Sequence, residues 1–257
     1  MRYYILESGS KGNSTLIFSK GKYLLIDNGL SERKFRSYLN EINVSLSNIN
    51  VVLVTHSHSD HTAGLKIFES RCIYATKSTT TLLDRDHELV PYRSYNLNGF
   101  KITVVPTSHD AVGSVGFIIE DSDNEKLVYI TDTGYIYERV LSYIKDADYY
   151  IFEANHDVRM QLTSGRPQYL IDRIMGDYGH LSNEDSAICL SEVITNRTKE
   201  IVLAHLSEEA NTPELALNTF YKIMAKRRVD VSHISIRCAK QREMVCGGTL
   251  TEEIFNG

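Results

Sequence analysis

Short apolar runs that each end in a histidine or an aspartate recur along this chain. Residues 51–54, 100–105, 126–130 and 200–204 form runs of this kind, and each is followed within a few positions by a His or an Asp. Apolar runs of four to six residues bounded by polar positions are typical of buried strands. Helices are expected at 167–175, 184–195 and 213–225, so the pattern predicts an α/β protein.

The polar residues that follow these strands are the candidates for a functional site. Three of them are His109 after the second run, Asp132 after the third and His205 after the fourth. The carboxyl ends of strands are the usual location of a site in a layered α/β protein. We therefore expect these side chains to lie close together.

The segment 56–61, with the sequence HSHSDH, follows the first run and carries the clearest chemical signal. Zn²⁺ binds nitrogen and oxygen ligands at about 2.0–2.2 Å, and this segment offers three imidazoles and a carboxylate. His56 and His58 are two residues apart in an extended stretch and can point to the same side. Asp60 and His61 follow as the chain turns and can face a second ion. A purely structural metal site is the alternative, but such sites usually use Cys, and no Cys lies within ten residues.

The strand predicted at 23–26 ends in Asp27, which we expect to orient the ligand loop by hydrogen bonds rather than to bind metal itself. Two metal ions about 3.5–4 Å apart polarise a phosphoryl or carbonyl oxygen and bring the pKa of bound water near 7. Asp60 is the candidate to bind metal and to accept a hydrogen bond from the resulting hydroxide. The sequence therefore predicts hydrolytic chemistry at a binuclear centre.

Asp27, the segment 56–61, His109, Asp132 and His205 together resemble the five ordered motifs of the metallo-β-lactamase superfamily. The resemblance covers nearly the whole chain and implies an αββα sandwich, in which two mixed sheets pack face to face with helices outside. It implies a first metal bound by His56, His58 and His109, a second bound by Asp60, His61 and His205, and Asp132 as the bridge. Hydrolytic members use a metal-bridging hydroxide, and His58 occupies the position where the redox-active di-iron branch usually carries Glu.

The leaving group requires a proton donor, and His is the side chain whose pKa best matches neutral pH. His156 and His180 are the two candidates, and for each the alternative is a histidine that only makes hydrogen bonds within a loop. Ser182 or Asn183 is expected to cap the helix at 184–195. Because a Gly and a His precede it, the start of this helix is a candidate phosphate-binding site. We predict substrate contacts from Asn155, Ser182 and Arg166.

Residues 8–14, 153–157, 179–183 and 205–207 are together similar to the bacterial YycJ/WalJ branch of the superfamily. Members of this branch are regarded as 5′-to-3′ DNA exonucleases, so DNA is the expected substrate. Lys11 and Ala210 depart from the usual pattern of the branch. The alternatives are a small-molecule hydrolase acting on a cyclic phosphodiester or a lactone, and a non-catalytic scaffold protein. Residues 8–14 can equally form only a glycine-rich hairpin between two strands.

Composition is compatible with these expectations. A chain of 257 residues that is 42% hydrophobic can bury one sizeable core, so one domain spanning 1–257 is predicted. The amino-terminal segment has no apolar signal region, and no run of about 18 apolar residues predicts a membrane span. Four scattered cysteines indicate thiols and a cytoplasmic location.

Net charge and residue types leave several properties of the site open. The net charge of −5 lacks the basic character of a tight, sequence-independent DNA binder. Basic residues do cluster in the C-terminal part, at 226–228 and as Arg237, Lys240 and Arg242, for which a solvated helix end is the alternative. The arginines that flank His156, which are Arg159, Arg166 and Arg173, are candidates to hold phosphates. The ligand set suits Zn²⁺, Mn²⁺ or Fe²⁺. Residue types alone do not decide among these metals, and they do not predict an oligomeric state.

Overall fold

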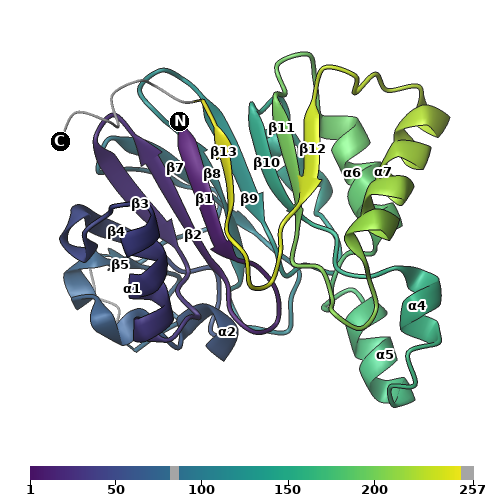
Figure 1. Cartoon of the computed structure of the whole chain (residues 1–257), viewed down its shortest axis with the longest axis horizontal. Helices are drawn as coiled ribbons and strands as arrows, with labels where there is room; N and C mark the ends of the chain where they lie inside the picture. The colour runs from purple at the N-terminus through teal and green to yellow at the C-terminus, as the bar shows by residue number, and fades with distance from the viewer. Residues whose placement is uncertain (82–86, 250–257) are drawn as a thin grey trace.

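Two mixed β-sheets lie face to face in the computed structural model, which describes residues 1–81 and 87–249 (Figure 1). The first sheet has six strands in the order β13-β1-β2-β3-β4-β5. These strands are β1 (Arg2–Glu7), β2 (Ser14–Ser19), β3 (Lys22–Ile26), β4 (Ile49–Leu53), β5 (Ile73–Tyr74) and β13 (Val245–Gly248). β13, β1, β2 and β3 pair antiparallel, whereas β3, β4 and β5 pair parallel.

The second sheet has seven strands in the order β12-β11-β10-β9-β8-β7-β6. They are β6 (Ser94–Leu97), β7 (Phe100–Pro106), β8 (Val115–Glu120), β9 (Lys126–Ile130), β10 (Tyr149–Glu153), β11 (Glu200–Ala204) and β12 (Ser235–Cys238). β6 to β9 pair antiparallel and β9 to β12 pair parallel. Each sheet thus has a parallel half, whose strands end on the same side.

Helices cover the outer faces of both sheets and one end of the sandwich (Figure 1). α1 (Glu32–Glu41) covers the first sheet, and α3 (Glu138–Ile144), α6 (Asn183–Val193) and α7 (Pro213–Arg227) cover the second. α2 (Ser59–Thr62), α4 (Val158–Leu162) and α5 (Gln168–Met175) lie at the lower end in Figure 1. α6 begins at Asn183 because the Ser182 hydroxyl accepts a hydrogen bond from the Asp185 amide at 3.1 Å. α7 begins in the same way, with Thr212 as its cap and Pro213 in its first turn.

Three apolar layers separate these elements and confirm the predicted αββα sandwich. Between the sheets, residues such as Ile26 and Leu53 of the first sheet pack with Phe117 and Tyr129 of the second. The outer face of the first sheet packs against α1 through Phe35. The outer face of the second sheet packs against α3, α6 and α7, which contribute Val140, Leu190 and Phe220.

Most of the predicted elements occur with small changes in their ends. The strands at 126–130 and 200–204 have the predicted bounds, the strand expected at 100–105 extends to Pro106, and the predicted helix at 184–195 spans Asn183–Val193. Residues 8–14 connect β1 to β2, as expected for a hairpin. Asp60 and His61 lie in the short helix α2, which turns the chain directly after His58.

Within the described residues, no helix is long and apolar enough to cross a membrane. The four cysteines are free thiols, of which Cys189 is buried and the others are half-buried. These findings agree with the sequence expectations for these features.

Candidate metal centre

Three of the polar residues that follow strands have a left-handed backbone conformation. Asp27 after β3, Asp132 after β9 and His205 after β11 have φ values of 56°, 58° and 56°. Such a conformation costs about 1–3 kcal/mol for a residue other than glycine, and it persists only where the surrounding structure holds it. Here the Asp27 amide donates to the Leu53 carbonyl at 2.8 Å, and the His205 amide donates to the Ser8 hydroxyl at 2.9 Å. The chain therefore turns sharply at these positions and is held there.

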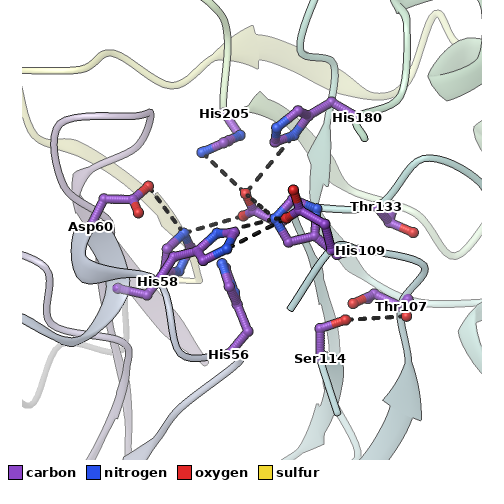
Figure 2. Close-up of polar contacts among 12 residues, drawn as sticks. His56, His58, Asp60, Thr107, His109, Ser114, Thr133, His180 and His205 are labelled. Atoms are coloured by element: carbon purple, nitrogen blue, oxygen red, sulfur yellow. Dashed lines mark hydrogen bonds and ion pairs between the residues drawn. The ribbon is translucent and has the colours of Figure 1, made fainter. Parts of the chain in front are cut away.

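His56, His58 and His109 form the first group of candidate ligands (Figure 2). Their ligating nitrogens lie within 4.8 Å of one another. The Nδ1 atom of His58 is 3.3 Å from the Nε2 atom of His109, and the rings of His56 and His58 are 4.7 Å apart. The structure thus brings together the three histidines that were predicted to share one ion.

Asp60, His61 and His205 form the second group, whose ligand atoms also lie within 4.8 Å of one another. Asp132 lies between the two groups. Its Oδ2 atom is 3.3 Å from His61 Nε2, and its Oδ1 atom is 3.5 Å from His205 Nε2 and 3.9 Å from His109 Nε2. Asp132 is therefore placed where the predicted bridge would have to be.

The outward nitrogens of four histidines are each held by another group. Nδ1 of His61 contacts Asp27 Oδ2 at 2.7 Å, and Nδ1 of His205 contacts Glu153 Oε1 at 3.1 Å. Nδ1 of His109 faces the Gly179 carbonyl at 3.1 Å, and Nδ1 of His56 faces the hydroxyl of its neighbour Thr55 at 2.9 Å. A hydrogen bond at Nδ1 leaves Nε2 free to bind metal, which is the usual arrangement around metal-bound histidines.

The inward atoms fit divalent ions. His56 Nε2, Asp132 Oδ2 and His205 Nε2 are buried and have no hydrogen-bond partner among the described residues. Leaving such polar atoms unsatisfied is costly, and two bound cations, one at each group, would satisfy all three. Burial lowers the pKa of His56 well below its usual value, which keeps the imidazole neutral and able to donate its lone pair. Burial alone would raise the pKa of Asp132, but the adjacent His205 and His61 lower it well below its usual range.

Asp27 lies where a residue that orients the ligand loop would be expected. It is fully buried, and its carboxylate accepts hydrogen bonds from the Thr55 amide and hydroxyl, both at 2.8 Å, as well as from His61. These contacts connect the end of β3 to the start of the 56–61 segment. They leave Asp27 without an atom directed at the candidate ions.

Glu153, at the end of β10, is a residue of the candidate centre to which the sequence analysis gave no role. Its Oε1 atom lies 3.1 Å from His205 Nδ1 and 2.8 Å from His180 Nδ1, and its Oε2 atom accepts from the Thr133 amide at 2.9 Å. Burial alone would raise the pKa of Glu153, but the charge of His180 and the hydrogen bonds from both histidines lower it to about 2. The available signal was its position, since it too is a polar residue at the end of an apolar run.

The structure separates the two histidines that were candidates for the proton donor. His180 is partly exposed, and its ring stacks on that of His205 with centroids 5.3 Å apart, so the two lie side by side at the centre (Figure 2). His156 is buried, lies in none of the candidate ligand groups and forms a backbone bridge to Ser182. Burial lowers the pKa of His156 to about 4, so it is neutral at pH 7. His180 therefore has the better position and exposure.

The predicted substrate contacts are largely occupied by contacts within the protein. Asn155 is buried and donates to the His205 carbonyl at 2.9 Å, so it shapes the ligand loop. Ser182 caps α6 and donates to Asp185 at 2.6 Å. Arg166 pairs with Glu209 at 2.9 Å and with Gln161 at 3.1 Å, in the connection between α4 and α5. These contacts favour structural roles for all three residues.

Asp110 and Arg173 lie at the rim of the centre; the sequence analysis gave Asp110 no role and considered Arg173 only among the arginines around Arg166 that could hold phosphates. Asp110 Oδ1 is 3.4 Å from both His58 Nε2 and His109 Nε2, while its Oδ2 atom accepts from Arg173 Nε at 2.6 Å. Tyr178, which is 66% exposed, borders the same small hollow as His109, Arg173 and His180. The rim therefore offers a cation and an exposed aromatic ring beside the candidate ligands.

Close backbone contacts support two of the loops at the centre. A Cβ atom on Gly134 would lie 2.2 Å from the Asp177 carbonyl oxygen, and one on Gly29 would lie 1.7 Å from the Asp60 carbonyl oxygen. Any side chain at these positions would push the loops apart. The glycines therefore let the loops that carry Asp60 and the segment before His180 pack against their neighbours.

Comparison with known proteins assigns the class. A family model described as a beta-lactamase superfamily domain matches residues 22–206, which is more than half of the chain. The chain therefore belongs to the metallo-β-lactamase superfamily.

Within this superfamily, the chain is similar to two named bacterial proteins. It is 36% identical over 244 residues to exodeoxyribonuclease WalJ of Streptococcus pneumoniae, with 90% of each chain covered. It is 32% identical over 239 residues to exodeoxyribonuclease YycJ of Bacillus anthracis, with 88% of this chain and 90% of the relative covered. The resemblance to the YycJ/WalJ branch is thus confirmed.

Solved structures show the same fold at low identity. The metallo-β-lactamase fold protein YhfI of Bacillus subtilis matches with a TM-score of 0.68 at 17% identity, over 96% of this chain and 99% of the other. Human short-form tRNase Z matches with a TM-score of 0.64 at 16% identity, over 95% and 98%. Zn²⁺-bound PqqB of Methylobacterium extorquens matches with a TM-score of 0.61 at 16% identity, over 95% and 99%. These matches support the architecture described above.

Proposed function

We propose that this protein is a metal-dependent phosphodiesterase that degrades DNA as a 5′-to-3′ exonuclease in the cytoplasm. The relatives named exodeoxyribonuclease, which are similar along about nine-tenths of the chain, support DNA as the substrate. The polarity rests on the resemblance to their branch. Free cysteines support a reducing compartment.

The observation that carries the proposal is the position of His180 beside the candidate metal ligands. His205 and His180 are both held by Glu153, so one buried carboxylate fixes a metal ligand and a partly exposed imidazole together. With Nδ1 held by Glu153, the Nε2 atom of His180 is the atom available to pass a proton to the oxygen of the departing nucleotide. His180 is accordingly the proposed proton donor, and Glu153 positions it.

The seven candidate ligands would hold two divalent ions. The proposed sets are His56, His58 and His109 for one ion, and Asp60, His61 and His205 for the other, with Asp132 between them. When bound, such ions lower the pKa of water to near neutrality and polarise a phosphoryl oxygen. We propose Zn²⁺ or Mn²⁺ as the ions, with Fe²⁺ as a third possibility compatible with these donors.

The side chains at the rim favour a nucleic acid substrate. Tyr178 is 66% exposed and borders the same hollow as Arg173 and His180. An exposed tyrosine can stack on a base, and an arginine can pair with a phosphate. These two side chains therefore favour a nuclease over the cyclic phosphodiesterase or lactonase alternative.

The test is a degradation time course on DNA duplexes labelled at the 5′ or the 3′ end, after chelation and then with Zn²⁺ or Mn²⁺ restored. We expect metal-dependent early release of the 5′ label as a mononucleotide. Early release of the 3′ label would show that the enzyme degrades DNA from the 3′ end instead. Hydrolysis of bis(p-nitrophenyl) phosphate without degradation of DNA would support phosphodiesterase chemistry but rule out DNA as the substrate.

A further inference from the structure

A second hollow, much larger than the one at the rim, lies beside the second group of candidate ligands. Its volume is about 570 Å³, and three loops form it: β1–β2, the loop from β11 to α7, and β12–β13 (Figure 1). The proposed hydrolysis uses none of the side chains that line it. We refer to it as the loop groove; its cations are Lys11, Lys240 and Arg242, and its apolar lining comes from Leu206, Pro213 and Ala239.

Hydrogen bonds connect the loop groove directly to the candidate metal centre. Leu206 of the groove is the residue after His205, and its carbonyl accepts from Gln241 Nε2 at 3.1 Å. The Ser8 hydroxyl accepts from the His205 amide at 2.9 Å, while the Ser8 amide donates to the Lys240 carbonyl at 3.2 Å. The groove therefore starts next to the ligand His205 and is fixed relative to it.

The cations of the loop groove are available to an anion. Lys11 pairs with Glu208, and Lys240 pairs with Glu243 at 2.6 Å, but both pairs are exposed. Exposed ion pairs contribute little stability, so a phosphate can replace the carboxylate. Arg242 is exposed as well and gives the groove three cations against two carboxylates. This local excess contrasts with the net charge of −5 for the whole chain.

The combination of cations with an apolar surface selects the class of ligand. Single-stranded nucleic acid presents phosphates to basic side chains and unstacked bases to apolar or aromatic surfaces, whereas a duplex presents mainly phosphates. The groove volume falls in the range of sites that take up small organic groups, so bases can enter it. The exposed Pro213 and the aliphatic stems of the lysines supply the surface on which they would lie, whereas Leu206 and Ala239 line the groove with little exposed area.

We propose that the loop groove binds the single-stranded stretch of DNA next to the phosphodiester that is cleaved. This inference rests on the proposed nuclease function and adds a binding site for the strand beyond the metal centre. The strand would pass from the centre, alongside His205, into the groove. Its phosphates would contact Lys11, Lys240 and Arg242.

The test is the binding of a fluorescein-labelled single-stranded hexanucleotide in EDTA, measured by anisotropy at several salt concentrations. Binding in EDTA needs neither metal nor turnover, so this test can succeed or fail independently of the degradation assay. The variant is Lys240→Ala with Arg242→Ala. The matched control is Lys222→Ala with Lys226→Ala, two exposed lysines on α7 outside the groove lining.

We expect the groove variant to bind more weakly and to lower the slope of log K against log salt by about 1.4, or about 0.7 for each lost phosphate contact. The control should keep the wild-type slope. An unchanged slope in the groove variant, or an equal loss in both variants, would overturn the site. If the groove variant loses as much affinity for a blunt duplex as for the single strand, the assignment to single-stranded DNA is overturned.

Discussion

Asp27 and Glu153 are two buried carboxylates that each hold a histidine of the candidate centre, one at the end of a strand in each sheet. The Asp27 carboxylate contacts His61 and, among the described residues, otherwise only Thr55. Glu153 contacts His205 and also His180, which is partly exposed at the rim. The first carboxylate therefore serves only the candidate ligand shell, whereas the second connects that shell to the proposed proton donor.

The two carboxylates also differ in their electrostatic surroundings. Burial raises the pKa of Asp27, which faces a single histidine. Burial acts on Glu153 too, but the two histidines around it lower its pKa to about 2. Asp27 and Glu153 thus occupy similar positions in the two sheets. Their proposed functions differ because only Glu153 contacts a second histidine, His180.

The largest effect is expected from the candidate ligands, which both carboxylates depend on. Asp60→Ala, like His61→Ala, should reduce DNA degradation to the level of metal-depleted protein while largely sparing the fold, because two-metal hydrolysis needs both ion positions. Asp60 suits this test best because its side chain is 23% exposed. The measurement is the degradation assay combined with thermal unfolding, and Asp123→Ala in an exposed turn is the control. Full activity after the change at Asp60 or at His61 would contradict the two-metal mechanism.

The next largest effect concerns His180, which distinguishes the Glu153 side from the Asp27 side. His180→Asn should lower kcat on DNA by about 10²–10⁴, the usual contribution of a positioned acid. Hydrolysis of bis(p-nitrophenyl) phosphate should fall far less, because nitrophenolate leaves without a proton. The exposed His233→Asn variant is the control. Equal losses on the two substrates would assign His180 to metal or substrate binding instead of proton transfer.

Replacing the carboxylates themselves tests the comparison directly. Asp27→Asn and Glu153→Gln should each weaken metal affinity about 10–100-fold, since both remove the group that orients a metal-binding histidine. Excess metal should restore DNA degradation in Asp27→Asn but only partly in Glu153→Gln, whose His180 has lost its partner. Metal titrations of activity on both substrates provide the readout. If excess metal fully restored DNA degradation in both variants, Glu153 would act only by orienting the metal-binding His205 and not through His180.

The smallest effect is expected at Glu125, a carboxylate outside the centre that serves as a reference for stability. Burial alone would raise its pKa, but hydrogen bonds from Lys199, Tyr149 and Thr249 help lower it to about 2. A carboxylate with a lowered folded-state pKa stabilises the fold above its usual pKa, and this stability is lost as pH falls toward 2. Glu125→Gln should therefore flatten the decline in unfolding free energy between about pH 4.5 and 2. Urea unfolding across that interval measures it, and an unchanged decline would contradict the assignment.

The sequence by itself determined the class of the site and most of the fold. The apolar runs were continuous because their strands lie between the other sheet and the outer helices and are buried on both faces, so their ends could be located from residue types alone. The segment from His56 to His61 indicated metal because few other arrangements need three imidazoles and a carboxylate in six residues. The order of Asp27, the segment 56–61, His109, Asp132 and His205 along the chain then matched the ordered motifs of one superfamily.

Only the tertiary structure decided which groups face each other across the centre. Glu153 is 27 positions from His180 and 52 positions from His205, and nothing in their local sequence shows that one carboxylate holds both rings. The three loops of the groove meet because β1, β11 and β12 end on the same side of the sandwich. Asp110, after β7, contacts Arg173 of α5 although 63 positions separate them. Residue types and local periodicity predict which polar residues lie at the end of each strand. The pairing of strands and the packing of the two sheets decide which of those ends become neighbours.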